Sequence, residues 1–517
     1  MDPQETSALD ANAEPASTGS PLDAGPRATT KAPGTAPGTA PGRTRALLLT
    51  LLLLLLLAAA LYFTVRPGPP FPLAVLAGTL ACWLLLAGAV CALRRARSVR
   101  ISVVVIAGAL LLGVAAISAP PSTSNDSARY AWDGIVQKAG VSPYAYVPLD
   151  DALTELRPRW LFVPGNGNAN GGTRCSPDLF ATAPVATHGE PSGQPLCTPI
   201  NRPNVPTIYP PTAELYFLAV RLTVPDGIGY AAFQLAGLLV SLAVTVMLLL
   251  ALPRLGLPRY LAAAWAWSPL VLIEGVNNAH VDLLGGALLL AAGLLLTAGR
   301  AGKPLRSGFV FGAAVATKLI PVIAAPALLF RRPVRFICAA LATFALLYTP
   351  YLLTAGWGVI GYLPGYLKEE GYSDQVGIRF ALAQFFSGGP WPMVLSAAAL
   401  LLLALTVLRR TTAHNVWEQQ TIMIGLTLLI VSPNYPWYAL LLLPAVVLSR
   451  YWEYIGVMIA LNIVYLLPGD PVFSGPVNRA SLAAAAVAIA IGAWRRRRAS
   501  YLACAGDEPG TAPQMAG

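Results

Sequence analysis

The stretch NDSARYAWDG at residues 125–134 gathers three charged side chains, Asp126, Arg129 and Asp133, in a chain whose charged fraction is only 11%. Carboxylates can accept protons and a guanidinium can hold an anion. Two structural interpretations compete with such chemistry. Asp126 could cap a helix, because Asn, Asp and Ser are all favoured at helix N-caps. Arg129 and Asp133, four residues apart, could form a surface ion pair. These interpretations stay open beside the chemical one.

The composition places these charges in a multi-span membrane protein. Of 517 residues, 56% are hydrophobic, and the charged fraction lies far below the quarter or so that is usual in soluble domains. The net charge of +11 does not indicate a nucleic-acid partner. Arg and Lys instead cluster in short runs between apolar segments, as the positive-inside rule requires of cytoplasmic loops.

Loop charges predict the topology. The basic run RRARSVR at 94–100 belongs inside, which puts the following segment outside. The closing RRRR at 495–498 is also inside only if 307–330 enters and returns, so we expect two short helices broken around Lys318–Pro321. About 14 membrane segments result, with both termini cytoplasmic. The predicted organisation is a disordered cytoplasmic tail at 1–44, three transmembrane helices at 45–119, an extracytoplasmic loop at 120–212, a transmembrane core at 213–495 and a cytoplasmic tail at 496–517.

Several short motifs resemble one enzyme family. They are D-x-x-R-Y-x-W-D-G from Asp126, a G-x-x-P-Y element from Gly140, YPPTAELYF at 209–217, NNAHVDLLGGAL at 277–288, ATKLIPVIAAPALL at 316–329 and SPNYPWYALLLLP at 432–444. Their order and their predicted places at outer membrane ends resemble the membrane-embedded glycosyltransferases of the C superfamily. The most similar group is family 87, the polyprenyl-phosphate-mannose-dependent mannosyltransferases of actinobacteria. The resemblance covers roughly residues 118–450.

The resemblance implies an all-α polytopic protein of the GT-C type, with a large first outer loop that carries the catalytic carboxylate. It implies an inverting transfer of mannose from a polyprenyl-phosphate donor to a glycolipid or cell-wall glycan acceptor at the outer face of the cell membrane. Asp126 matches the family's first outer-loop aspartate and is the expected base. Burial would raise the pKa of Asp126 and Arg129 would lower it, and the sequence does not decide between them.

Four basic groups are candidates to hold the donor phosphate or the acceptor: Arg129, His280, Lys318 and Arg379. His280 and Asp282 fall at a predicted outer turn, where a His can also be an ordinary loop residue. Lys318 is the single charge of the apolar run 307–330. An unpaired ammonium there is costly, and a phosphate would compensate it. The alternative is that Lys318 snorkels to the outer interface.

Aromatic side chains gather on the same predicted side. Tyr130, Trp132, Tyr209 and Trp437 could contact sugar or lipid. An interfacial aromatic belt explains Trp437 and its neighbour Tyr438 equally well.

The Cys and His residues predict a disulfide and no metal site. Cys175 and Cys197 are the only Cys pair in the predicted outer loop, where a disulfide can persist. The three His residues lie far apart in the sequence, and no Cys-x-x-Cys occurs. No glycine-rich nucleotide cradle precedes a helix either, which argues against direct use of a nucleotide sugar. We expect no cofactor, and the lipid-linked sugar donor is what the family resemblance implies.

Two other functions remain as alternatives. One keeps the fold and changes the sugar, as in a polyprenyl-phosphate-arabinose-dependent arabinofuranosyltransferase. The other is a lipid or solute transporter, for which broken helices with a charge near the membrane midplane are typical. Here Asp126, His280 and Arg379 are predicted at the outer rim, and no duplicated halves are visible, which favours the transferase.

Overall fold

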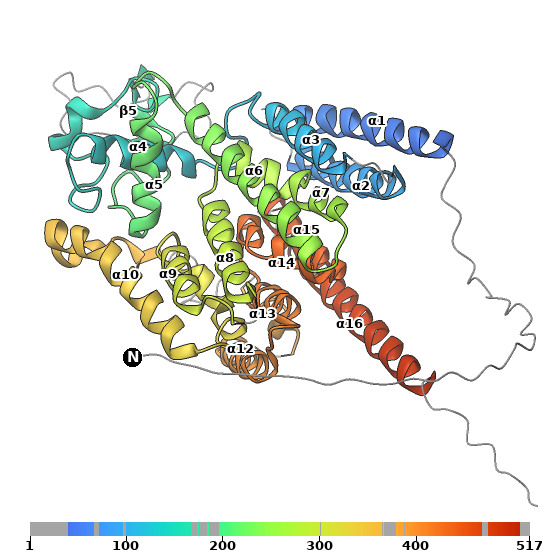
Figure 1. Ribbon diagram of the computed structural model, residues 1–517. Coiled ribbons are helices and arrows are strands. Elements are labelled where there is room, and N and C mark those ends of the chain that lie inside the picture. The colour runs from blue at the N-terminus through green and yellow to red at the C-terminus, as the bar shows by residue number, and fades with distance from the viewer. Residues whose placement is uncertain are drawn as a thin grey trace, which may run out of the picture. The chain divides into compact units, whose positions relative to one another are not determined.

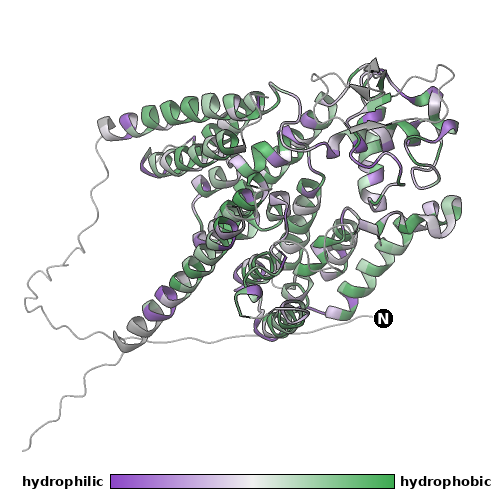
Figure 2. Cartoon of the chain, turned by 180° about the vertical axis from the view of Figure 1, so that it is seen from behind, coloured by the Kyte–Doolittle hydropathy of each residue, from purple (hydrophilic) through white to green (hydrophobic). Residues whose placement is uncertain are grey.

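Helices make up most of the described chain, and the longest of them are apolar (Figure 1). The computed structural model describes residues 40–66, 72–96, 100–164, 166–167, 173–174, 183–185, 196–299, 301–363, 365–366, 379–386, 388–467 and 474–506. Figure 2 shows hydrophobic residues running along nearly all of the helices. This composition is what a helix needs when its outer surface faces lipid rather than water.

Six of the described helices are long and apolar enough to cross a membrane. They are α1 (Ala40–Val65), α2 (Pro72–Ala96), α6 (Ala231–Arg254), α10 (Pro333–Ala355), α12 (Trp391–Arg410) and α16 (Ser474–Gly506). A seventh span results if η3 (Val271–Asn277) and α8 (Asp282–Thr297), bent by 112° at a short break, are counted as one. The chain is therefore a multi-pass membrane protein by the length and composition of its helices. The 14 segments and the GT-C fold stay predictions.

Helix α6 illustrates how the sequence sets the ends of a span. Its 24 residues cover about 36 Å at 1.5 Å per residue, slightly more than the hydrocarbon core of a bilayer. The helix stops where Gly256 takes a φ of +69°, and the Leu257 amide then donates to the Leu252 carbonyl at 2.8 Å. This is a Schellman-type end, for which glycine is suited because it lacks a Cβ.

The shorter elements pack among these spans, and those of the C-terminal half supply much of the buried core. They are α3 (Ile101–Ala116), η2 (Arg259–Ala262), α7 (Ala263–Ala266), α13 (Val416–Val431), η7 (Pro436–Leu440), α14 (Leu443–Ser449), η8 (Trp452–Tyr454) and α15 (Ile455–Leu466). Two fully buried indoles tie α7 and its surroundings to neighbours, because Trp265 donates to the Ser241 carbonyl and Trp267 to the Val105 carbonyl. Each indole N–H thus finds an acceptor in an otherwise apolar core.

The apolar run 307–330 is broken where the sequence predicted. Helix α9 (Pro304–Val315) ends before Lys318, and the 3-10 helix η4 (Ile320–Ala327) begins after it. Pro321 and Pro326 lie inside η4 and cannot donate backbone hydrogen bonds, which disfavours a continuous α-helix. Whether this run re-enters the membrane stays a prediction.

The predicted outer loop, 120–212, contains one α-helix and short strands, and a second helix begins at its end. Helix α4 (Asp126–Lys138) packs against α5 (Pro211–Leu222). Between them lie η1 (Asp151–Leu156) and five short strands: β1 (Val163–Pro164), β2 (Asn166–Gly167), β3 (Thr173–Arg174), β4 (Ala183–Val185) and β5 (Leu196–Thr198). They form two antiparallel sheets, one with the order β1-β5-β4 and one pairing β2 with β3. In the first sheet, Val163 lies opposite Cys197.

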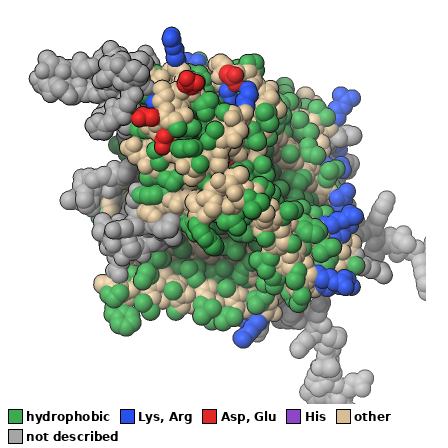
Figure 3. Space-filling view, turned by 90° about the vertical axis from the view of Figure 1, so that its left-hand side faces the viewer, with side chains coloured by type: hydrophobic (Ala, Val, Ile, Leu, Met, Phe, Trp, Pro, Cys, Tyr) green, Lys and Arg blue, Asp and Glu red, His purple; other side chains and the backbone are tan. Residues whose placement is uncertain are grey.

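One face of the described chain is largely hydrophobic and is hollowed near its centre (Figure 3). Most Lys and Arg side chains visible in that view line one edge, and the Asp and Glu side chains lie toward the top. The helix ends that carry basic pairs include those of α2, at Arg94 and Arg95, and α12, at Arg409 and Arg410. This separation of charge is the pattern expected of a protein whose basic loops share one side of the membrane.

Candidate active site

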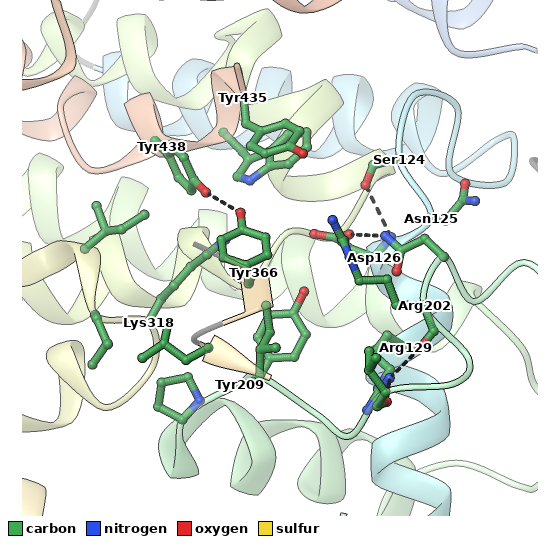
Figure 4. A pocket seen from close by; sticks show the side chains of 18 of the residues that line it. Ser124, Asn125, Asp126, Arg129, Arg202, Tyr209, Lys318, Tyr366, Tyr435 and Tyr438 are labelled. Atoms are coloured by element: carbon green, nitrogen blue, oxygen red, sulfur yellow. Dashed lines mark hydrogen bonds between the residues drawn. The ribbon is translucent and has the colours of Figure 1, made fainter. Parts of the chain in front are cut away.

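A pocket of about 530 Å³ lies where six segments distant in the sequence meet (Figure 4). Its lining residues come from 123–129, 201–210, 318–320, 363–366, 435–438 and Tyr465. Asp126 is the acidic residue among these lining residues, and Lys318, Arg202 and Arg129 are the basic ones. In Figure 4, Lys318 and Asp126 lie on opposite sides of Tyr366. The pocket therefore combines a carboxylate, cationic groups and aromatic walls.

Asp126 opens helix α4 but does not cap it. The N-cap residue of α4 is Asn125, which makes no side-chain capping hydrogen bond, and the Asp126 amide donates to Ser124 Oγ at 3.2 Å. The Asp126 carboxylate instead accepts from Asn201 Nδ2 at 3.3 Å and faces His280, whose Nδ1 lies 3.5 Å from Asp126 Oδ2. The cap interpretation of Asp126 is therefore wrong, because the side chain is directed to residues of the pocket wall and its surroundings.

Two neighbouring asparagines fix the chain that leads into α4. Asn277 Nδ2 donates to the carbonyls of Ala116, Ala119 and Pro120, and its Oδ1 accepts from Ser122. Asn278 Oδ1 accepts from the amides of residues 122 and 123. Since both asparagines are fully buried, they replace the water that these backbone groups would otherwise bind. Asn277 and Asn278, the first two residues of the NNAHVD motif, thus fix the turn that places Asp126 at the pocket.

His280 follows these asparagines directly. It is buried and stacks on Trp437, with ring centroids 3.8 Å apart and planes 21° from parallel. Its Nε2 lies 3.4 Å from Glu274 Oε2, on the side away from Asp126. Ala279, just before it, adopts the left-handed conformation with φ +57°, which is unusual for a residue with a Cβ. A strained residue beside a buried His is typical of functional sites.

The pocket lowers the pKa of Asp126. Burial by itself raises this pKa, but the close approach and charge of His280, together with the charges of Lys318 and Arg202, outweigh burial and bring the pKa below its ordinary value. The sequence left the direction open between burial and Arg129, and the structure assigns the lowering to other cations. Asp126 is thus an ionised carboxylate at neutral pH.

Lys318 does face the pocket, but it is not unpaired. Its Nζ lies 2.7 Å from Asp282 Oδ2, and it lies 4.9 Å from the centre of the Tyr438 ring. The Lys318 side chain keeps 16% of its surface exposed, whereas Asp282 is sealed. The expectation of an uncompensated ammonium is therefore wrong, because the buried Asp282 carboxylate compensates the Lys318 charge. The part of Lys318 that is exposed to the pocket can still contact an anion.

Arg129 lines the pocket and is held by a buried carboxylate. Its Nε donates to both oxygens of Asp133, at 2.9 and 3.1 Å, and Nη1 donates to the carbonyls of Arg202 and Val205. Because both side chains of the pair are nearly sealed, the expected surface ion pair is in fact a buried one. Arg129 thereby anchors the segment that carries Arg202.

Several residues of the site were not identified from the sequence: Glu274, Asn201, Arg202, Tyr366, Tyr435 and Tyr465. Arg202 and Asn201 lie in an irregular segment without a recognisable motif. Tyr366 OH and Tyr438 OH are 3.2 Å apart across the pocket. For Glu274 a signal did exist, since an acidic residue within the apolar run 260–275 is costly unless it is functional or paired.

The aromatic candidates divide into two groups. Tyr209 and Trp437 line the pocket. Tyr130 instead packs on Phe217, with ring centroids 4.4 Å apart, and Trp132 packs on Phe162 at 4.9 Å. Because Tyr130 and Trp132 expose almost nothing, they serve the core of the outer loop, and the structure does not bring them into the pocket.

Two further candidates lie elsewhere. Arg379 is buried near η6 (Ala383–Phe385), where its carbonyl accepts from Gln384, and it is not among the described residues that line the pocket. Cys197 is disulfide-bonded. Cys175 lies outside the described residues, so its pairing with Cys197 stays a prediction. Within the described part of the chain, no group of His, Cys, Asp and Glu is arranged to hold a metal ion.

The described chain is helical and polytopic, with a carboxylate, cations and aromatic side chains around one pocket. Residues 207–433 match the model of glycosyltransferase family 87, which confirms the family that the sequence motifs predicted. The matched region contains His280 and Lys318, begins after Asp126 and ends before Trp437. No curated protein and no solved structure matched the chain.

Proposed function

We propose that this glycosyltransferase moves mannose from a polyprenyl-phosphate donor to a glycolipid or cell-wall glycan, with inversion, at the outer face of the cell membrane. The observation that carries the proposal is that Asp126 and Lys318 line the same pocket in a chain of this family. One group can accept a proton and the other can bind a phosphate, which are the two requirements of the reaction.

In the proposed step the Asp126 carboxylate takes the proton of an acceptor hydroxyl. The hydroxyl oxygen forms a bond to the anomeric carbon as the bond from that carbon to the phosphate oxygen breaks. The polyprenyl phosphate departs with the bonding electrons and is held by Lys318 and Arg202. A phosphate is a good leaving group, so this route asks for no general acid.

Inversion is supported by the acidic residues of the pocket. Retention by double displacement needs a carboxylate nucleophile in addition to an acid or base. Among the described lining residues, Asp126 is the one carboxylate, and the nearby Asp282 is committed to Lys318. A single displacement with Asp126 as base needs no second carboxylate.

Placement at the outer face is supported by charge. The basic ends of α2 and α12 and the basic segment of α16 belong inside by the positive-inside rule. The pocket is built mainly on α4 and the segment before α5, within the loop predicted outside. A lipid-linked donor suits this side, since a polyprenyl tail can remain in the bilayer while its sugar reaches the pocket.

The test is transfer by purified wild-type and Asp126→Asn protein with radiolabelled donors. Polyprenyl-phosphate-mannose and polyprenyl-phosphate-arabinose are supplied separately with the host's glycolipid extract. We expect mannose transfer by the wild type, a loss of about a thousandfold in Asp126→Asn, and a product with inverted anomeric configuration by NMR.

Other results would redirect the proposal. Transfer of arabinose alone would keep the mechanism and change the sugar. A retained configuration, or equal activity of Asp126→Asn, would remove Asp126 as the base. Donor flux across vesicles without any sugar transfer would indicate transport instead.

A further inference from the structure

We infer that Glu274 is a positioning residue that acts on Asp126 through His280, so that the working base is a chain of carboxylate, imidazolium and carboxylate. The inference rests on the proposed function. Glu274 does not line the pocket and would touch no substrate. Its effect has to pass through the His ring that separates it from Asp126.

The three groups form a continuous line from the protein interior to the pocket. Glu274 Oε2 lies 3.4 Å from His280 Nε2, and His280 Nδ1 lies 3.5 Å from Asp126 Oδ2. The side chains of Glu274 and His280 are 3% and 0% exposed, whereas Asp126 keeps 17% of its surface open. Only the pocket end of the line meets solvent or substrate.

This geometry favours a His280 ring with protons on both nitrogens. A neutral imidazole carries one N–H and one lone pair. Because a carboxylate oxygen faces each nitrogen, a neutral ring would direct its lone pair at one of the two carboxylates. The imidazolium presents an N–H to both of them. Burial opposes any single charge, but the two carboxylates compensate the cation at close range.

The surroundings prevent the line from rearranging. Asn278 Nδ2 donates to Glu274 Oε2 at 3.0 Å and also to Thr123 Oγ1 at 2.6 Å, so one amide holds both Glu274 and the segment before Asp126. Trp437 covers one face of the His280 ring. Glu274 lies in η3, a π-helical turn, and such turns often occur at functional sites.

A protonated His280 also balances the charges near the base. The groups concerned are Asp126 on α4, Glu274 on η3, Asp282 on α8, Lys318 before η4, Arg202 before α5 and His280 itself, with the phenol of Tyr465 on α15. Three are anionic and three, counting the imidazolium, are cationic. A neutral ring would leave a net negative site, which would weaken binding of an anionic donor and the ionised state of Asp126.

The first test is a double-mutant cycle on transfer kinetics. Glu274→Gln keeps the size of the side chain and removes its charge. We expect kcat to fall about tenfold or more, because the carboxylate that orients the His280 ring and stabilises its imidazolium is lost. In a His280→Gln background the same substitution should change kcat little, because the residue through which Glu274 acts is already gone. An equal loss in both backgrounds would overturn the inference.

Glu418→Gln is the matched control. Glu418 is a half-buried carboxylate on α13, and it is not among the described lining residues. We expect its removal to leave transfer unchanged. The alkaline limb of the pH profile should move to lower pH in Glu274→Gln and stay in place in Glu418→Gln. No movement in Glu274→Gln would count against the inference.

A second measurement does not depend on activity. The chain has three His residues, so a His188→Asn/His414→Asn protein with ¹⁵N-labelled histidine reports on His280 alone. At pH 7.5 we expect the nitrogen shifts of a doubly protonated ring, and those of a neutral ring after Glu274→Gln. A neutral ring in the parent protein would overturn the inference. If no sugar is transferred yet the ring is protonated, the proposed function fails, while the ionic arrangement of Glu274, His280 and Asp126 is confirmed.

Discussion

Helix α4 carries two aspartates about two turns apart that have opposite surroundings. Asp126 borders the pocket, where neighbouring cations lower its pKa. Asp133 is sealed beside Arg129, and burial raises its pKa. Both residues begin as the same carboxylic acid on the same helix. The comparison teaches that the partners supplied by distant segments, rather than the residue type, decide which aspartate is suited to proton transfer and which to holding the fold.

The Asp133 side is built as a closed polar cluster. Asp133 pairs with Arg129, and the neighbouring Glu214 accepts hydrogen bonds from Thr207 and Gln137 at 2.8 Å each. Two carboxylates near one guanidinium are expensive to bury, yet each retains specific donors. The cluster joins α4 to α5, and thereby holds the first turn of α4 at the pocket.

Asp133→Asn should have the largest effect of these substitutions, and it separates the stabilising role of Asp133 from the proton-accepting role of Asp126. The substitution leaves Arg129 without its buried partner, and we expect a loss of about 3 kcal/mol in the free energy of unfolding. Thermal unfolding in detergent measures this as a lowered Tm. The kcat of the protein that remains folded should change little. A protein with unaltered Tm and no transfer would reverse the assignment of the two aspartates.

The pH profile gives the next test of the comparison. Asp126 acts as a base only when ionised, and its pKa is lowered from the ordinary 3.8, so transfer should persist until the pH falls below that value. Arg202→Gln removes one of the lowering charges. The acid limb of kcat/KM should therefore move to higher pH, and kcat/KM at pH 7 should fall about tenfold because a phosphate contact is also lost.

Arg409→Gln, at the end of α12, is the matched removal of an arginine outside the pocket lining and should leave the profile unchanged. An acid limb that stays fixed in Arg202→Gln would mean that Asp126 is not the group reported by that limb.

Local sequence signals predicted much of the frame. The helix at α4, the break before Pro321 and the order of the apolar segments all follow from hydrophobic runs, prolines and charges that lie close together in the chain. Such signals act within a few residues, so one sequence suffices to see them. The number of spans does not follow from such runs, because elements such as η7 and α14 are apolar but too short to cross a membrane alone.

The composition of the pocket could not be predicted in the same way. His280 meets Asp126 across 154 positions, and Arg202 reaches the pocket from an irregular segment. Aromatic residue type also failed as a guide, since Tyr130 is buried in the loop core while Tyr209, which packs against it, lines the pocket. Long-range packing decides which side of such a pair is open, and no local pattern encodes that choice.

Asn201→Ala should have the smallest effect on transfer of these substitutions. It tests how much an exposed neighbour of Asp126 contributes. Asn201 donates one hydrogen bond to Asp126 Oδ1 from a solvent-exposed position. An exposed bond of this kind exchanges readily with water, so we expect kcat/KM to fall only about two- to threefold, with no change in Tm. Transfer assays beside Glu274→Gln provide the measurement. If Asn201→Ala lowered kcat/KM as much as Glu274→Gln does, then any neighbour that orients Asp126 would suffice. The charges of Glu274 and His280 would then not be what prepares Asp126 as the base.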